Sequence, residues 1–100
     1  MLTDTPGTSA RLVSEFGYND GGAALVAAKL ANLHGELAEI VERWWRDGAT
    51  IHFSVRGYTV QSLMADSAMN PIAAILTLDW LLREPDKAER AIRHGHDRIT

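Results

Sequence analysis

The chain of 100 residues contains no cysteine. This absence excludes a disulfide framework, a zinc site with thiolate ligands and a thiol nucleophile, and it fits a reducing cytoplasm. An excess of basic charge is also missing, because the formal net charge is −3 and the isoelectric point is near 5.7. Nucleic-acid-binding domains concentrate positive charge on one face, so this balance argues against that class of protein.

Long apolar runs are absent as well. The longest, from Ile72 to Leu82, is interrupted by Thr77 and Asp79, and it falls short of the ~20 residues that a transmembrane helix needs. The N-terminal segment is mostly polar and shows neither the basic nor the apolar region of a secretory signal. We therefore expect one domain over residues 1–100, with residues 1–8 as a loose tail.

Catalytic motifs are missing too. No serine lies in a nucleophile elbow, and no glycine-rich loop has the spacing of a dinucleotide or phosphate site. We interpret His34 and His52 as solvated or hydrogen-bonded histidines. The segment His94-Gly95-His96-Asp97 resembles a set of metal ligands, but it lies past an expected helix end, and we interpret it as that end and a tail. We expect no enzymatic activity, no metal and no cofactor.

The sequence does contain one long helical pattern, from Asp20 to Gly48. Apolar residues recur in it at helical spacing and form a single stripe: Val26, Leu30, Leu33, Leu37, Ile40, Val41 and Trp44. The pattern predicts one amphipathic helix, capped at Asp20 and stopped at Gly48. Beside the stripe runs a second sector, here called the small-residue sector for its three alanines, which consists of Ala27, Ala31, His34, Ala38 and Trp45.

A short β-hairpin is expected after this helix. Ile51, Phe53 and Val55 alternate with polar residues, Arg56-Gly57 can turn, and residues 58–60 return. Shorter helices are predicted over residues 10–16, 61–69, 72–83 and 84–94, the third of them after an Asn70 cap and Pro71. The predicted fold class is mainly α (α+β), with a long amphipathic helix and several shorter helices packed around a small two-stranded β-hairpin.

The polar side of the long helix is the best candidate for an interaction surface. It carries carboxylates at Glu36, Glu39 and Glu42, with Asp20 and Asp47 near the ends. Asn32 and a partly accessible Trp45 would add contacts, since tryptophan is enriched at interface hot spots. An acidic surface of this kind would be steered toward a basic groove on a partner.

Two segments give the chain a family resemblance. Residues 42–53 (GluArgTrpTrpArgAspGlyAlaThrIleHisPhe) and 67–76 (SerAlaMetAsnProIleAlaAlaIleLeu), set around the expected hairpin, are similar to small phage-encoded anti-CRISPR proteins. The chain most resembles inhibitors of the type I-F CRISPR–Cas surveillance complex. The resemblance implies a non-enzymatic inhibitor in the cytoplasm of a host bacterium. It also implies that Asn32, Glu36, Glu39 and Arg43 contact subunits of the effector complex and block target DNA binding or duplex opening, with no direct contact to nucleic acid.

Two other functions stay open. Arg83, Lys87, Arg90 and Arg93 make a basic edge on the C-terminal helices, which a small DNA-binding regulator would turn toward phosphates. Alternatively, the small residues Ala27, Ala31 and Ala38 would let a second copy approach closely, as in a self-associating phage structural protein.

Overall fold

The protein is described by a computed structural model, which covers the backbone of residues 5–99 and the side chains of residues 6–94. Within this range the chain folds into six α-helices and no β-strand, so the mainly α class is confirmed and the β-hairpin is not. The helices are α1 (Thr5–Phe16), α2 (Asp20–Ala31), α3 (Gly35–Asp47), α4 (Val60–Asp66), α5 (Pro71–Arg83) and α6 (Pro85–Ile99). None of these described helices is long and apolar enough to cross a bilayer.

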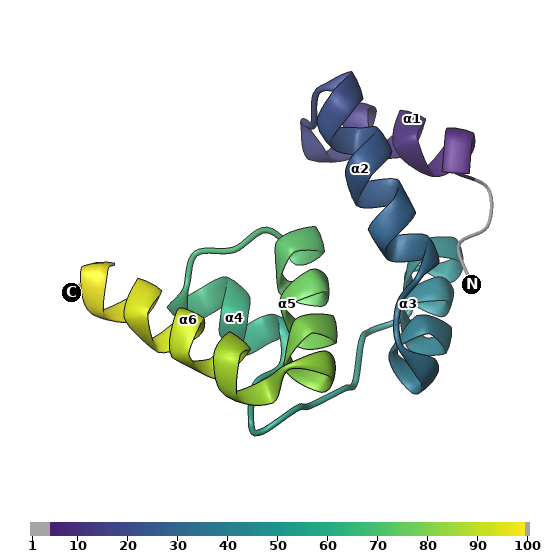
Figure 1. The fold of residues 1–100 in the computed structure, drawn as a ribbon. Helices are drawn as coiled ribbons and strands as arrows, with labels where there is room; N and C mark the ends of the chain where they lie inside the picture. Colours follow the sequence, from purple (N-terminus) through teal and green to yellow (C-terminus); the bar gives the residue numbers. More distant parts are fainter. Residues whose placement is uncertain (1–4, 100) are drawn as a thin grey trace.

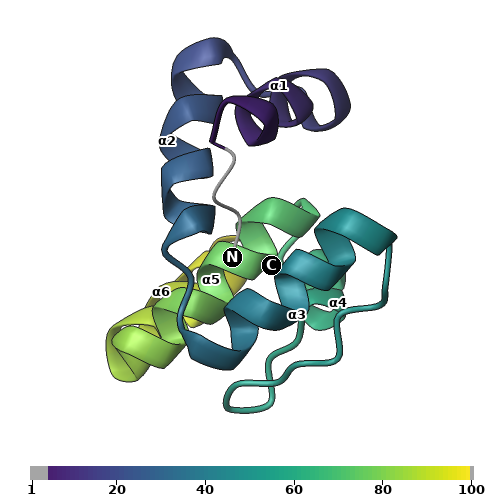
Figure 2. The ribbon, with the colours of Figure 1, turned by 90° about the vertical axis from the view of Figure 1, so that its right-hand side faces the viewer.

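Two groups of helices pack closely, and one core of buried side chains joins them. Figures 1 and 2 show α1 packed against α2 at one end of the molecule, and α4 and α6 packed against α5 at the other. In Figure 2, α2 runs almost vertically while α3 lies across it. The change of direction between these two helices decides which predicted site residues can share a surface.

The single long helix predicted from Asp20 to Gly48 is wrong, because the chain breaks after Ala31. His34 has an extended backbone conformation (φ −77°, ψ 124°) and Gly35 has a positive φ of 40°. Glycine tolerates such a φ without a steric cost, so the second helix starts there in a new direction. The N-cap of α2 is Asn19 rather than Asp20, since the Asn19 side chain accepts a hydrogen bond from the Gly22 amide at 2.6 Å.

The expected hairpin is reduced to a tight turn. The backbone amides and carbonyls of Val55 and Tyr58 exchange two hydrogen bonds of 2.9 Å, and Arg56 and Gly57 between them both have positive φ. This is the geometry of a type I′ turn. The return strand cannot extend, because Thr59 already caps α4 in a reciprocal pair of hydrogen bonds with Ser62. The predicted alternation of burial survives in part, since Ile51 is buried and His52 is exposed.

The other helix ends differ from prediction by several residues. The helix α1 begins at Thr5 rather than Ala10, so residues 5–8 are helical and not a loose tail. Residues 1–4 of the expected tail lie outside the described part of the chain. The fourth helix ends at Asp66 rather than Met69, and the sixth continues past Gly95 to Ile99. The cap of α5 is confirmed, because the Asn70 side chain accepts from the Ala73 amide at 2.7 Å and Pro71 follows.

The core is built around α5, as its nearly continuous apolar sequence predicts. Five of its residues are buried: Ile72, Ala74, Ile75, Leu78 and Leu81. Leu12 of α1, Leu30 of α2 and Leu37 of α3 are buried in the same core. Each such side chain contributes roughly 1.5–3 kcal/mol when it leaves water. The side chains of α5 at Leu76 and Trp80 stay partly exposed, which leaves one face of this helix without a full cover.

Candidate functional site

Three of the predicted contact residues share one exposed face of α3. Glu36, Glu39 and Arg43 are all exposed. At 100° per residue their side chains leave the helix within about 60° of one another. The opposite side of α3 is anchored in the core by Leu37, Ala38 and Val41, so the polar face is held outward by rigid packing. We call Glu36, Glu39 and Arg43 the α3 face.

A hollow of about 490 Å³ lies beside this face. It extends from α3 to the loop that follows the helix, and its lining residues are Glu36, Ile40, Arg43, Ala49, Thr50 and His52. Glu36 and Arg43 therefore border both a convex helix surface and a concave one. A carboxylate, a guanidinium and an imidazole around a partly apolar floor can hold polar groups of a protein partner. His52, which the sequence suggested only as a solvated residue, joins the candidate site through this hollow.

Asp20 and Asn32 lie outside the α3 face, although both are exposed. Asp20 opens α2 and Asn32 ends it, which separates them by about 18 Å along the helix axis. The Asn32 side chain donates to the Ala28 carbonyl at 2.8 Å, so it is already engaged within its own helix. The break between α2 and α3 removes the continuous polar side that sequence periodicity suggested.

Trp45 is part of an aromatic cluster rather than an open contact. Its ring stacks on Phe16 of α1, with ring centroids 6.1 Å apart and planes inclined by 16°. The Arg11 guanidinium lies 4.3 Å above the Trp45 ring and also donates a hydrogen bond to the Trp45 backbone carbonyl. Trp44 meets the Trp45 ring edge-on and lies tilted against Phe16, and both tryptophans are half-buried. Trp45 therefore joins α1 to α3.

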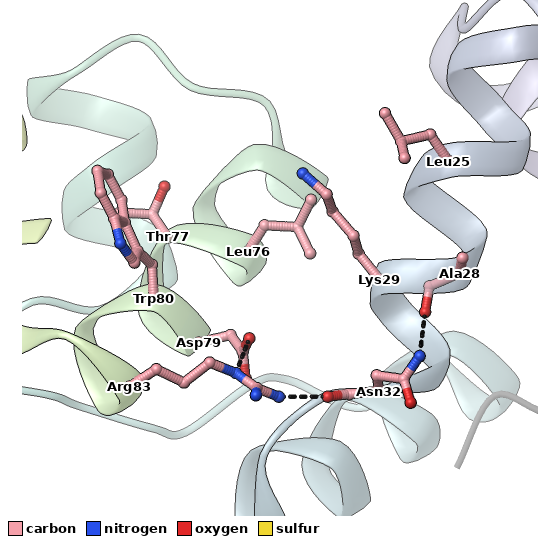
Figure 3. Close-up of a pocket in the computed structure, with 9 residues that line it drawn as sticks. All are labelled: Leu25, Ala28, Lys29, Asn32, Leu76, Thr77, Asp79, Trp80 and Arg83. Atoms are coloured by element: carbon pink, nitrogen blue, oxygen red, sulfur yellow. Dashed lines mark hydrogen bonds and ion pairs between the residues drawn. The ribbon is translucent and has the colours of Figure 1, made fainter.

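A larger cleft, which sequence analysis missed, separates α2 from α5 (Figure 3). It is open to solvent and has a volume of about 620 Å³. Leu25, Ala28, Lys29 and Asn32 line it from α2, and Leu76, Thr77, Asp79, Trp80 and Arg83 line it from α5. Two features hinted at this cleft: Leu25 falls outside the apolar stripe of α2, and α5 is apolar on almost every side. The sequence does not show that these two helices face each other.

One end of the cleft is closed by a polar clamp between Asp79 and Arg83. The Asp79 carboxylate accepts from the His34 backbone amide at 2.9 Å and pairs with the Arg83 guanidinium at 2.8 Å. Arg83 in turn donates to the Asn32 backbone carbonyl (Figure 3). The clamp thus supplies partners for two backbone groups at the break between α2 and α3, which would otherwise depend on water.

The surfaces behind the alternative functions are partly engaged within the protein. Within the basic edge of the C-terminal helices, Arg83 pairs with Asp79, and Arg93 pairs with Glu89. Glu89 also pairs with Arg56 at 3.2 Å. In the small-residue sector, Ala27 and Ala38 are buried in the core, so they offer no surface to a second copy.

No protein-family model, curated protein or solved structure matches this chain.

The part of the chain with described side chains holds no group of three histidine, aspartate or glutamate residues that could bind a metal. His94 is exposed, and the side chains of His96 and Asp97 lie outside the described residues. The candidate site is therefore defined by surface shape and charge: the α3 face with its hollow, and the α2–α5 cleft.

Proposed function

We propose that this protein is a non-enzymatic inhibitor of a type I-F CRISPR–Cas surveillance complex, acting in the cytoplasm of a host bacterium. The α3 face would contact subunits of the complex and block target DNA binding or duplex opening. The observation that carries the proposal is the exposure of Glu36, Glu39 and Arg43 on one face of a helix that the core holds rigidly. The identity of the partner comes from the resemblance of residues 42–53 and 67–76 to anti-CRISPR proteins.

The charge of the α3 face supports a partner with a basic groove. Two carboxylates and one guanidinium give this face a net charge of −1, which complements lysine- and arginine-rich surfaces that bind nucleic acid. The mixed character argues for wedging between protein subunits rather than mimicry of a whole duplex, which would need a denser array of negative charge. His52 and the hollow beside α3 would accept a polar side chain from the partner.

The first test is co-elution of the protein with a purified type I-F surveillance complex on a size-exclusion column, followed by addition of target duplex DNA. The proposal expects the protein to migrate with the complex and the captured DNA to decrease. Separate migration with unchanged DNA capture would refute it. Binding of the isolated protein to DNA, in a manner that weakens with salt and is lost in an Arg90→Ala variant, would favour the regulator instead.

A charge reversal then locates the interface. Glu36→Lys or Glu39→Lys should weaken binding to the complex by at least about tenfold, because like charges placed opposite each other in an interface cost several kcal/mol. Asp66→Lys is the matched control, since Asp66 is also exposed but lies at the end of α4. Equal loss of binding in all three variants would show that net charge, and not the α3 face, determines the interaction.

A further inference from the structure

The cleft between α2 and α5 has a hydrophobic interior that the rest of the protein leaves open. Leu25 is 60% exposed on the α2 side, and Leu76 and Trp80 are only partly buried on the α5 side. The Trp80 indole nitrogen donates a hydrogen bond to the Glu84 carboxylate at 3.0 Å, which favours one orientation of the ring. Tryptophan is one of the residue types enriched at interface hot spots, and Leu25 adds exposed apolar surface on the other wall of the cleft.

One basic side chain of the cleft has no ion-pair partner. Among the residues that line the cleft, Asp79 pairs with Arg83, which leaves Lys29 unpaired. None of the carboxylates in the described part of the chain pairs with the Lys29 ammonium. Figure 3 shows the Lys29 side chain extending from α2 toward α5 over the apolar lining. A carboxylate on an apolar partner would complement this arrangement.

The shape of the cleft favours a segment of a protein over a small molecule. Small-ligand sites enclose most of the ligand surface, whereas Leu25 leaves one wall of this cleft exposed to solvent. The lining residues lie within two stretches of eight residues, from Leu25 to Asn32 and from Leu76 to Arg83. That span is about 10 Å, or two helical turns, and an amphipathic helix of this length can lay one apolar face into an open groove.

We propose that the α2–α5 cleft binds a short amphipathic helix of a protein partner. This helix presents two large apolar side chains one turn apart to Leu25, Leu76 and Trp80, and a flanking carboxylate to Lys29. The proposal goes beyond the inhibitor function, because it uses a different surface from the α3 face and does not depend on which complex the α3 face contacts.

The test uses stapled helical peptides of about 14 residues, long enough to hold two or more turns. Each peptide carries leucines at positions i and i+4. Glutamate stands at i+1 in one peptide and at i+3 in another, because the helix can bind in either direction along the cleft. Matched peptides carry glutamine or lysine in place of the glutamate. Binding is followed by ¹H–¹⁵N spectra of the full chain. The glutamate peptide should produce a saturable shift of the Trp80 indole signal, while the indoles of Trp44 and Trp45 stay in place.

Charge-swap variants test the role of Lys29. The lysine peptide should bind about fivefold more weakly than the glutamate peptide, as expected for one partly exposed ion pair. Lys29→Glu should reverse this order. Lys87→Glu is the matched control, because Lys87 is the other lysine of the chain and is exposed on α6. Leu25→Ala should weaken every peptide without loss of folding, since this side chain makes little contact within the protein.

Several results would overturn the proposal. One is the lack of a saturable Trp80 shift with any peptide of the series. Another is equal binding of the glutamate and lysine peptides, or the same effect from Lys87→Glu as from Lys29→Glu. Shifts of the Trp80 indole with decanoate but not with peptide would identify a small carboxylate as the occupant, and shifts with protein concentration alone would identify a second copy; either outcome rejects the proposed helix.

Discussion

Replacing Asp79 by alanine is expected to destabilise the protein by about 2 kcal/mol, because it removes the centre of the clamp. The carboxylate accepts from the His34 amide at 2.9 Å and pairs with Arg83 at 2.8 Å, and its side chain is only 15% exposed. A hydrogen bond to a charged group is worth ~1.5–3 kcal/mol, and a partly exposed ion pair adds ~0.2–1 kcal/mol. His34 is exposed, so water can replace part of the lost hydrogen bond and the lower values apply.

The assay is urea unfolding followed by circular dichroism, with thermal unfolding as a second readout. A loss of about 2 kcal/mol should lower the melting temperature by roughly 8–16 °C in a domain of this size. Asp79→Asn keeps an acceptor for the His34 amide and loses only the charge, so it should cost about 1 kcal/mol. Asp66→Ala, at an exposed site on α4, should stay within about 0.5 kcal/mol of the unmodified protein. If Asp79→Ala were no more destabilising than Asp66→Ala, the clamp would not stabilise the break between α2 and α3.

Two further predictions concern stability. Leu78 is fully buried in α5, whereas Leu25 is 60% exposed. Leu78→Ala should therefore lower the free energy of unfolding in urea by about 2–5 kcal/mol, and Leu25→Ala by less than about 0.5 kcal/mol. Similar losses of stability in both variants would contradict the assignment of the core. Asn70→Ala removes the hydrogen bond from the Asn70 side chain to the Ala73 amide and should cost about 0.5–2 kcal/mol. An unchanged melting temperature in this variant would show that α5 does not depend on its cap.

The helix α5 could be predicted from sequence because all its determinants are local. The Asn70-Pro71 start and the dense apolar run both act within a few residues of one another. The break at residues 32–34 could not be predicted in this way. The apolar spacing of Leu30, Leu33 and Leu37 continues through it, and all three side chains are buried, although Leu30 belongs to α2, Leu33 to the break and Leu37 to α3. The groups that satisfy the freed backbone belong to Asp79 and Arg83, more than 40 residues away in the chain.

The predicted hairpin failed because two local preferences compete for the same residues. Alternation from Ile51 to Val55 favours a strand, and the turn at Arg56-Gly57 forms as expected. The pairing residues on the return side, however, are the residues that begin α4. Thr59 can cap a helix only if it leaves the ladder, and the hydrogen bonds with Ser62 show that the helix prevails.

The candidate site was predictable where helical phase alone decides exposure. Glu36, Glu39 and Arg43 lie on the outer face of α3 because the apolar residues of that helix fix its opposite side in the core. Trp45 was expected to be a partly accessible contact residue, but its cover by Arg11 and Phe16 depends on how α1 packs, which the sequence does not show. The α2–α5 cleft required knowledge of which helices face each other, which no local pattern provides.

The clamp connects the two candidate binding surfaces physically. Arg83 lines the α2–α5 cleft and also holds the Asn32 carbonyl, while Asp79 holds the His34 amide directly before α3 begins. These two side chains therefore contribute to fixing the direction of the α3 face relative to the cleft, together with the core packing of α3. Loss of Asp79 should disturb both surfaces together, whereas Glu36→Lys and Lys29→Glu change one surface each and leave the clamp intact. A loss of binding in Glu36→Lys can consequently be assigned to the α3 face, and one in Lys29→Glu to the cleft. A loss of binding at both surfaces in an Asp79 variant can be assigned to the clamp.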